Sequence, residues 1–396
     1  SSHVRPASLR ALVAVYGKTP SSTQLLAAGG ASQWETSRVL AAGFTDVAYE
    51  EHRVHRIFRH TVSVRDVPEL RNWCVRDDGA LEIGAATPIG ALRRIFTKLQ
   101  RDPQSFDPHQ ASLNALVTQA RYFANENVRH TGSVAGGLVS CHHLSDMLPV
   151  WVALDAQVDL ASQSKGLRTV PVRELIDVNA GRLALAPDEI VVALVLPPRD
   201  PQGFITETFK QSIRRTDSMA LVNAAFSAER DAVGALGKVC LAFGGLGAPG
   251  LRAAKTEAAV DDLGVNPASA RAIDLQDVLQ ILYEEIDHIN VRELPDDMRA
   301  YQRDVAVAFL RRFLRNAGAQ LGSDEEKDRL QQPPCRGRQI FSEEAISGSI
   351  VGRAMVNRYL AQHTHGDTRY TVDEQLPEDG LYAAIVGASI ARGELI

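Results

Sequence analysis

The sequence predicts an α+β protein of two or three domains, and three observations support this prediction. The chain has 396 residues, more than one ordinary hydrophobic core accommodates. Its first half mixes helical and alternating apolar patterns, whereas a run of strands followed by a run of helices occupies the second half. The pair Pro197-Pro198 stands between the halves and favours a boundary there.

Residues 1–70 predict a small α/β lobe. The pattern over 6–16 is helical, and an apolar strand expected over 24–28 runs into a glycine pair. A second strand is expected over 46–50, and the stretch that follows is rich in histidine and arginine.

Residues 71–200 predict a larger lobe of the same domain. Its expected elements are strands at 80–86 and 189–196, amphipathic helices at 89–99 and 111–124, and a small-residue loop at 132–140 before the apolar segment 147–160.

Residues 201–320 predict a smaller α+β domain, an antiparallel sheet plus helices. Strands are expected over 204–210, 220–228 and 239–243, followed by helices over 270–282 and 298–317. The polar, proline-containing segment 321–347 predicts a linker, and 348–396 begin a further unit.

Composition excludes several classes of function. A formal net charge of -5 provides no basic field for a phosphate backbone, so nucleic acid is not an expected partner. No transmembrane segment is expected, because Asp155 and Asp159 interrupt the most apolar stretch. The four cysteines are scattered, which favours a reducing compartment (cytoplasm or mitochondrial matrix) and excludes an iron–sulfur cluster in this chain.

Two glycine loops carry the chemical signal. They are LLAAGGAS at 25–32 and TGSVAGG at 131–137. The missing Cβ atoms of a glycine pair allow backbone N–H groups to approach a pyrophosphate closely. Neither loop matches GxGxxG, so a Rossmann site is not supported, and either loop taken alone is more simply explained as a structural turn.

Further motifs follow these loops in a fixed order. They are Tyr122-Phe123-Ala124, the LSDMLP segment at 144–149, FKQSIRRTD at 209–217 and FGGLGAP at 243–249. Together they resemble the flavoprotein domain of the xanthine dehydrogenase, aldehyde oxidase and carbon monoxide dehydrogenase family. The resemblance implies a two-part FAD-binding domain over 1–200 and a flavoprotein C-terminal domain over 201–320.

The resemblance also implies how FAD would be held. The main chain of two loops would cradle its pyrophosphate, and the residues concerned are Ala28, Gly29, Gly30, Ala31 and Ser32, then Ser133, Ala135, Gly136 and Gly137.

Side chains would contact the rest of the cofactor. Asp146 would bond a hydroxyl of FAD, or else cap a helix. Phe123 would pack on the isoalloxazine ring, or else belong to the core. Val191 or Val192 would line the same ring.

Two basic positions complete the expected site. Lys210 would stabilise the reduced, anionic flavin, or else be a solvated lysine at a strand end. Arg214 lies in a loop that would border the ring, and a salt-bridged surface turn is the alternative.

Residues 349–353 and 364–370 resemble the lead-in to the molybdenum domain of the same family. No molybdopterin is expected, since only the first piece of that domain would be present. Partners are therefore expected, either iron–sulfur and molybdenum subunits or a larger complex, with NAD as a further candidate.

Two functions remain open. The first is an FAD-binding electron-transfer module, of oxidoreductase ancestry, that does not hydroxylate a substrate by itself. The alternative is a degenerate, non-catalytic accessory subunit of a larger assembly, for example a mitochondrial one. It is motivated by Ala31, Ser32 and Gly137, which stand where the family carries threonine, an acidic residue and asparagine. Losing two or three such contacts, at roughly 1 kcal/mol each, would weaken FAD binding about ten- to a hundredfold.

Overall fold

The computed structural model describes residues 2–18, 35–53, 57–177, 181–247, 249–262, 272–289, 296–317, 357–370, 373–381 and 383. Contacts divide the chain into two compact units, 1–324 and 325–396. In the described residues, no helix has the length and apolar character needed to cross a bilayer.

The small lobe contains a parallel sheet with strand order β1-β3-β2. Its strands are β1 (Ser2–Val4), β2 (Glu35–Ala41) and β3 (Ile57–Ser63), with α1 (Leu9–Lys18) after β1 and α3 (Thr45–Arg53) between β2 and β3.

The predicted helix at 6–16 is confirmed as α1, but the strand predicted over 46–50 is wrong. Those residues form α3. Val47, Ala48 and Tyr49 are too short an apolar run to decide between helix and strand, and Asp46 suits the first turn of a helix. The strand expected at 24–28 lies outside the described residues.

The large lobe is built on an antiparallel sheet with strand order β4-β5-β10-β6-β7. Its strands are β4 (Trp73–Val75), β5 (Leu81–Gly84), β6 (Gln157–Ser162), β7 (Gly166–Pro171) and β10 (Ile190–Leu196), and a separate ladder joins β8 (Ile176–Asp177) to β9 (Arg182–Leu183). Its α-helices are α4 (Leu92–Leu99), α5 (Pro103–Phe106), α6 (Gln110–Tyr122), α7 (Glu126–Thr131), α8 (Gly136–Val139), α9 (Leu148–Ala153) and α10 (Val172–Leu175). The strands and helices predicted in this lobe are thereby confirmed to within a few residues.

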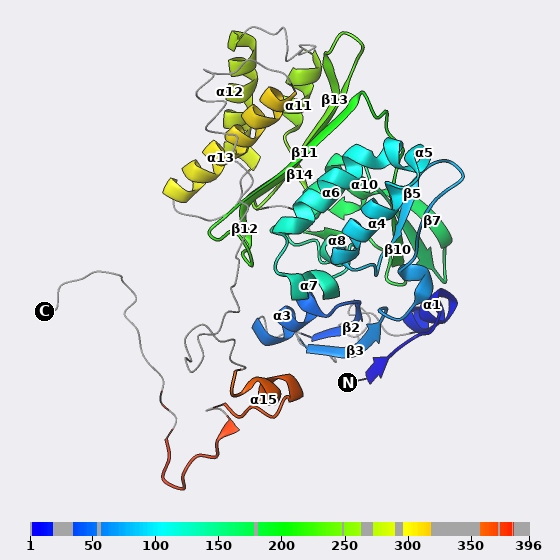
Figure 1. Cartoon of the computed structure of the whole chain (residues 1–396), viewed down its shortest axis with the longest axis vertical. Helices are drawn as coiled ribbons and strands as arrows, with labels where there is room; N and C mark the ends of the chain where they lie inside the picture. Colours follow the sequence, from blue (N-terminus) through cyan, green and yellow to red (C-terminus); the bar gives the residue numbers. More distant parts are fainter. Residues whose placement is uncertain are drawn as a thin grey trace, which may run out of the picture. The chain divides into compact units, whose positions relative to one another are not determined.

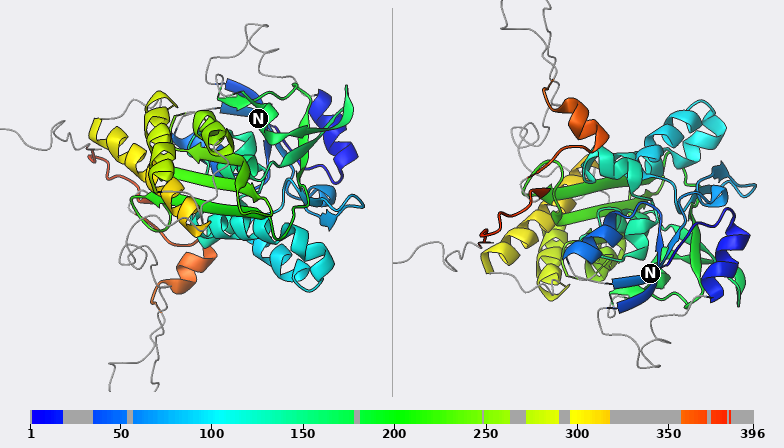
Figure 2. Two further views of the ribbon diagram at one scale, coloured as in Figure 1. Left: turned by 90° about the horizontal axis from the view of Figure 1, so that it is seen from above. Right: turned by 90° about the horizontal axis from the view of Figure 1, so that it is seen from below.

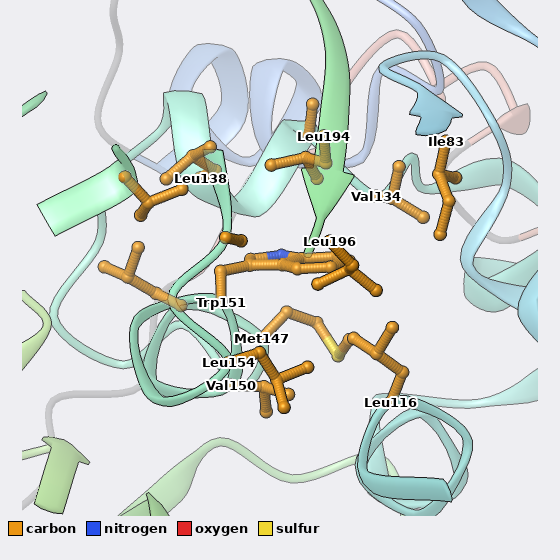
Figure 3. Packing of buried hydrophobic residues seen from close by; sticks show 14 of the residues in the cluster. Ile83, Leu116, Val134, Leu138, Met147, Val150, Trp151, Leu154, Leu194 and Leu196 are labelled. Atoms are coloured by element: carbon orange, nitrogen blue, oxygen red, sulfur yellow. The ribbon is translucent and has the colours of Figure 1, made fainter. Parts of the chain in front are cut away.

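The core of this lobe surrounds Trp151 on α9, which is fully buried. Figure 3 shows its indole ring between Leu194 and Leu196 of β10 and Met147 at the start of α9. Each such buried side chain contributes about 2 kcal/mol through removal of apolar surface from water. This packing holds α9, and with it the segment before it, at a fixed place on the sheet.

The second domain is an antiparallel sheet with helices on one face, as predicted. It consists of β11 (Phe204–Ser212), β12 (Ala220–Arg230), β13 (Leu236–Gly244), β14 (Leu251–Arg252), α11 (Ala254–Asp262), α12 (Ala272–Ile289) and α13 (Asp296–Asn316). Figure 2 shows α12 and α13 together on one face of this sheet.

The opposite face of the sheet packs on α6 and α9 of the first domain. Strand periodicity explains this division, because neighbouring residues point to opposite faces. Phe226 packs in the cluster beneath α12 and α13, whereas Ala225 packs in the cluster around Trp151. The two domains therefore share one interface, and β11 runs along it.

In the second unit, α15 (Leu360–His365) ends at Gly366, whose φ of 82° suits glycine. The predicted linker at 321–347 and the motif at 349–353 lie outside the described residues. The boundaries predicted at 200, 320 and 347 stay predictions.

Candidate functional site

The turn between β2 and α3 lies directly against the end of α7. A Cβ atom on Gly43 would stand 2.0 Å from the carbonyl oxygen of Thr131 and 3.0 Å from the nitrogen of Gly132. A Cβ on Gly132 would in turn stand 3.7 Å from Oγ1 of Thr45. Figure 1 shows α7 between the small lobe and the rest of the large lobe. The small lobe therefore meets the second glycine loop through two glycines.

The second glycine loop is shaped by its own hydrogen bonds. The Ala135 amide donates to the carbonyl of Ala85 at 3.2 Å, and the Gly136 amide donates to the Ser133 hydroxyl at 3.1 Å. Among the described residues, the amide of Gly137 has no such acceptor. Among the described residues, the Ser133 amide likewise has no acceptor, so Ser133 and Gly137 are the predicted loop donors available to a ligand.

A buried hydroxyl faces this loop. Ser145 Oγ is buried and has no hydrogen-bond partner among the described residues. A Cβ on Gly137 would stand 3.0 Å from that oxygen. A buried hydroxyl without a partner costs about 1–3 kcal/mol, so a polar group placed beside Gly137 would be stabilised there.

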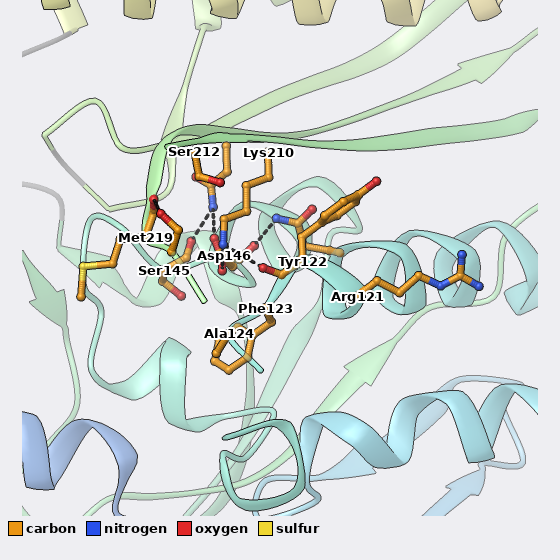
Figure 4. Close-up of polar contacts among 12 residues, drawn as sticks. Arg121, Tyr122, Phe123, Ala124, Ser145, Asp146, Lys210, Ser212 and Met219 are labelled. Atoms are coloured by element: carbon orange, nitrogen blue, oxygen red, sulfur yellow. Dashed lines mark hydrogen bonds and ion pairs between the residues drawn. The ribbon is translucent and has the colours of Figure 1, made fainter. Parts of the chain in front are cut away.

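Asp146 and Lys210 form a buried ion pair between the two domains. Asp146 precedes α9, Lys210 lies on β11, and Lys210 Nζ is 2.6 Å from Asp146 Oδ2. Their side chains are only 9% and 3% exposed. Lys210 Nζ also donates to the carbonyl of Tyr122 at 2.9 Å, at the end of α6 (Figure 4). An ammonium has three N–H donors, so one remains for a further acceptor.

Amide side chains hold Asp146 in place. Asn223 Nδ2 donates to Asp146 Oδ1 at 3.3 Å, and Gln119 Nε2 donates to the Asp146 carbonyl at 3.0 Å. Burial raises the pKa of the Asp146 carboxyl, while the Lys210 ammonium and the Asn223 amide act in the opposite direction. Asp146 is thus fixed by three elements, because β11 and β12 bond its carboxylate and α6 bonds its main-chain carbonyl.

Phe123 follows α6 and lies beside the glycine loop. Its ring is half-buried, and Cε1 would be 3.9 Å from a Cβ on Gly132. Arg129 on α7 donates from Nη1 to the carbonyls of Phe123 at 2.7 Å and Ala124 at 3.3 Å. These bonds fix a strained segment, since Ala124 has a φ of 40°.

The remaining predicted residues are more distant from this centre. Arg214 is exposed in the turn between β11 and β12, where Nη2 donates to the carbonyl of Asp217 at 2.6 Å. Asn125 Nδ2 in turn reaches Asp217 Oδ1 at 3.3 Å. Val191 is buried in the cluster around Trp151, whereas the half-buried Val192 packs against the small-lobe core.

Ala28, Gly29, Gly30, Ala31 and Ser32 lie outside the described residues. Within the described ranges, no three His, Cys, Asp or Glu residues are grouped as a metal site. The rings of His142 and His143 stack on each other with centroids 4.4 Å apart.

Gly43 and Arg129 belong to this site but were not among the residues that the sequence predicted for it. A signal for Gly43 was present, because the apolar residues Val39, Leu40 and Ala41 precede it and Thr45-Asp46 follow it. That order is typical of a strand, a tight turn and the first turn of a helix.

Two families of known proteins match this chain. Residues 3–199 match the FAD-binding domain family of molybdopterin dehydrogenases, and residues 207–317 match the CO dehydrogenase flavoprotein C-terminal domain family.

Among curated proteins, xanthine dehydrogenase of Oryza sativa subsp. japonica is 26% identical over 379 residues, covering 90% of this chain and 26% of that protein. The chain thus spans about a quarter of the length of the xanthine dehydrogenases it matches. The putative xanthine dehydrogenase FAD-binding subunit of Escherichia coli is 28% identical over 242 residues, covering 60% of this chain and 78% of that protein.

Solved structures share the fold. Carbon monoxide dehydrogenase of Hydrogenophaga pseudoflava matches with a TM-score of 0.62 and 21% identity, over 81% of this chain and 98% of that one. Quinoline 2-oxidoreductase of Pseudomonas putida 86 matches with a TM-score of 0.59 and 19% identity, over 80% and 98%. With both of its flavoprotein domains matched, this chain belongs to the flavoprotein family of the xanthine and carbon monoxide dehydrogenases.

Proposed function

We propose that this chain binds FAD as an electron-transfer module, with the pyrophosphate held where the β2–α3 turn meets the second glycine loop. The observation that carries the proposal is the approach of Gly43 to Thr131, which leaves no room for a Cβ atom. Close contact of two glycine-containing turns brings main-chain amides from both lobes to one place. Such amides suit a dianionic group.

The β2–α3 turn has the residues that the family resemblance requires. Thr45 and Asp46 follow Gly43, whereas Ala31 and Ser32 follow the glycine pair at 29–30. The carbonyl of Phe44 accepts the first helical hydrogen bond of α3, from the Ala48 amide at 2.9 Å. Phenylalanine has no side-chain oxygen for capping, so first-turn amides of α3 remain for an anion. We therefore favour Gly43–Asp46 over Ala28–Ser32 as the first phosphate turn.

The other end of the cofactor fits the Asp146–Lys210 pair. FAD, when bound, would accept an electron pair and release electrons singly. Lys210 offers one free N–H donor and a buried positive charge, which favours an anionic partner beside it. Asp146 fixes the position of that charge, and the Phe123 ring beside Gly132 would exclude water from the flavin.

Partner subunits are part of the proposal. The matched Escherichia coli protein is named as a FAD-binding subunit, and the matched plant proteins are about four times longer than the match. Iron–sulfur and molybdenum subunits, or domains with those centres, would supply or take the electrons.

One observation favours the accessory-subunit alternative. Lys210 and Asp146 bond each other, and this pair alone would stabilise the domain interface without any cofactor. In that case Lys210 and Asp146 serve the fold, and no flavin is bound.

Titration of the purified chain with FAD separates these functions. We expect quenching of flavin fluorescence, with a dissociation constant in the micromolar range or below, and a yellow complex that survives gel filtration. A colourless protein that leaves flavin fluorescence unchanged at micromolar FAD would contradict the electron-transfer function and favour the accessory one.

A further inference from the structure

Phe44 holds a conformation that disfavours its own side chain. Its φ is 59°, in the left-handed region, which is unusual for a bulky residue. Part of its apolar surface also stays in contact with solvent, because the residue is 37% exposed. A strained residue whose apolar ring faces solvent points to a role outside the fold itself.

A second ring lies next to Phe44. The His3 ring, from β1, has its centroid 6.0 Å from that of Phe44, with an interplanar angle of 42°. Arg5 Nε donates to His3 Nε2 at 3.2 Å, which fixes the orientation of the imidazole ring. The two rings, here called the aromatic platform, therefore form an exposed aromatic surface.

The aromatic platform adjoins the proposed phosphate turn. Phe44 stands between Gly43, which touches Thr131, and Thr45, which faces Gly132. Lys210, the proposed partner of the flavin ring, lies on β11 in the second domain, whereas both platform rings belong to the small lobe. A dinucleotide held by its pyrophosphate at this turn would extend its flavin toward β11 and its adenosine toward the small lobe.

We propose that the aromatic platform of Phe44 and His3 stacks on the adenine ring of FAD. The inference rests on the proposed function, and it adds a residue that selects the dinucleotide over FMN. Stacking of a base on an aromatic side chain requires an exposed ring face.

Three proteins and two ligands test the inference. FAD and FMN are titrated separately into the wild-type chain, Phe44→Asn and Phe44→Trp, and melting temperatures are recorded. Asparagine tolerates the left-handed region, so Phe44→Asn should melt at the same temperature as wild type or higher. We expect it to bind FAD about ten- to a hundredfold more weakly, with FMN affinity unchanged. Phe44→Trp should keep the affinity for FAD.

The outcomes distinguish the two proposals. If the wild-type chain binds FAD and Phe44→Asn binds it equally well, the aromatic platform has no role in recognition. An equal loss of FAD and FMN affinity in Phe44→Asn would also overturn the proposal. FMN has no adenine, so the substitution would then act on phosphate binding by the turn. If the wild-type chain binds neither flavin, the proposed function itself fails.

Discussion

The two ends of the proposed site differ in the groups that form them, which are main-chain atoms at one end and charged side chains at the other. At the turn end, Gly43 and Gly132 bring main chain against main chain, and missing side chains make the contact possible. At the pair end, the charged side chains of Lys210 and Asp146 contact each other in the domain interface, where both are almost fully buried. An added side-chain atom should therefore disrupt the turn end, whereas removal of a charge should destabilise the pair end.

Removal of the Lys210 charge should have the largest effect. Lys210→Met leaves Asp146 buried without its partner, and we expect a loss of about 3–5 kcal/mol in the free energy of unfolding. Urea denaturation measures this loss. Lys238→Met is the matched control, since Lys238 forms a 2.7 Å pair with Glu229 but is 78% exposed, and its loss should be about 0–1 kcal/mol. Equal losses of unfolding free energy in Lys210→Met and Lys238→Met would show that burial gives the Lys210–Asp146 pair no special importance.

The same variant should acquire a different pH dependence. Burial raises the pKa of Asp146, so the folded state binds its proton more tightly than the unfolded state does. Stability from this group is present in acid and is lost as pH rises from about 4, the ordinary carboxyl value, through the folded pKa. Without Lys210 the pKa rises further, so the destabilisation by Lys210→Met should grow with pH. A destabilisation that is constant across a pH series would show that the charges are not responsible.

Addition of one carbon at the turn end is the next test. Gly43→Ala places a Cβ against the Thr131 carbonyl, and displacement of that backbone should cost roughly 1–3 kcal/mol. Gly237→Ala is the control, because a Cβ there meets nothing within 4 Å. We expect FAD affinity to fall more than tenfold in Gly43→Ala only. If both variants bind FAD equally well, the turn does not hold the pyrophosphate.

The smallest expected effect is a gain. Gly137→Asn restores the family's side chain in the loop, and one hydrogen bond from that side chain to FAD, worth about 1 kcal/mol, should tighten FAD binding about fivefold. Gly181→Asn, at a position with open space, should leave the affinity unchanged. Isothermal titration calorimetry resolves this difference, and weaker binding in Gly137→Asn would mean that the loop cannot accept the side chain.

Sequence analysis succeeded where the signal was local and strong. The apolar segments 204–210, 220–228 and 239–243 predict three strands, and the structure has them as β11, β12 and β13. In the small lobe the short segment 46–50 does not have enough periodicity to separate helix from strand, and the prediction there was wrong.

The site was predictable only in part. Resemblance singled out Asp146 and Lys210, but their mutual bond depends on how β11 crosses the first domain, and 64 residues of sequence separate them. The sequence does not single out Gly43, because single glycines are common. Its role depends on the close approach of the Thr131 carbonyl, which only the structure shows.

Hydrogen–deuterium exchange with and without FAD tests the central claim most directly. The account predicts that FAD protects two separate groups of amides together, 43–46 and 131–137, and leaves 25–32 unchanged. Protection confined to one group, or protection of 25–32 in place of 43–46, would contradict a pyrophosphate held between the two turns.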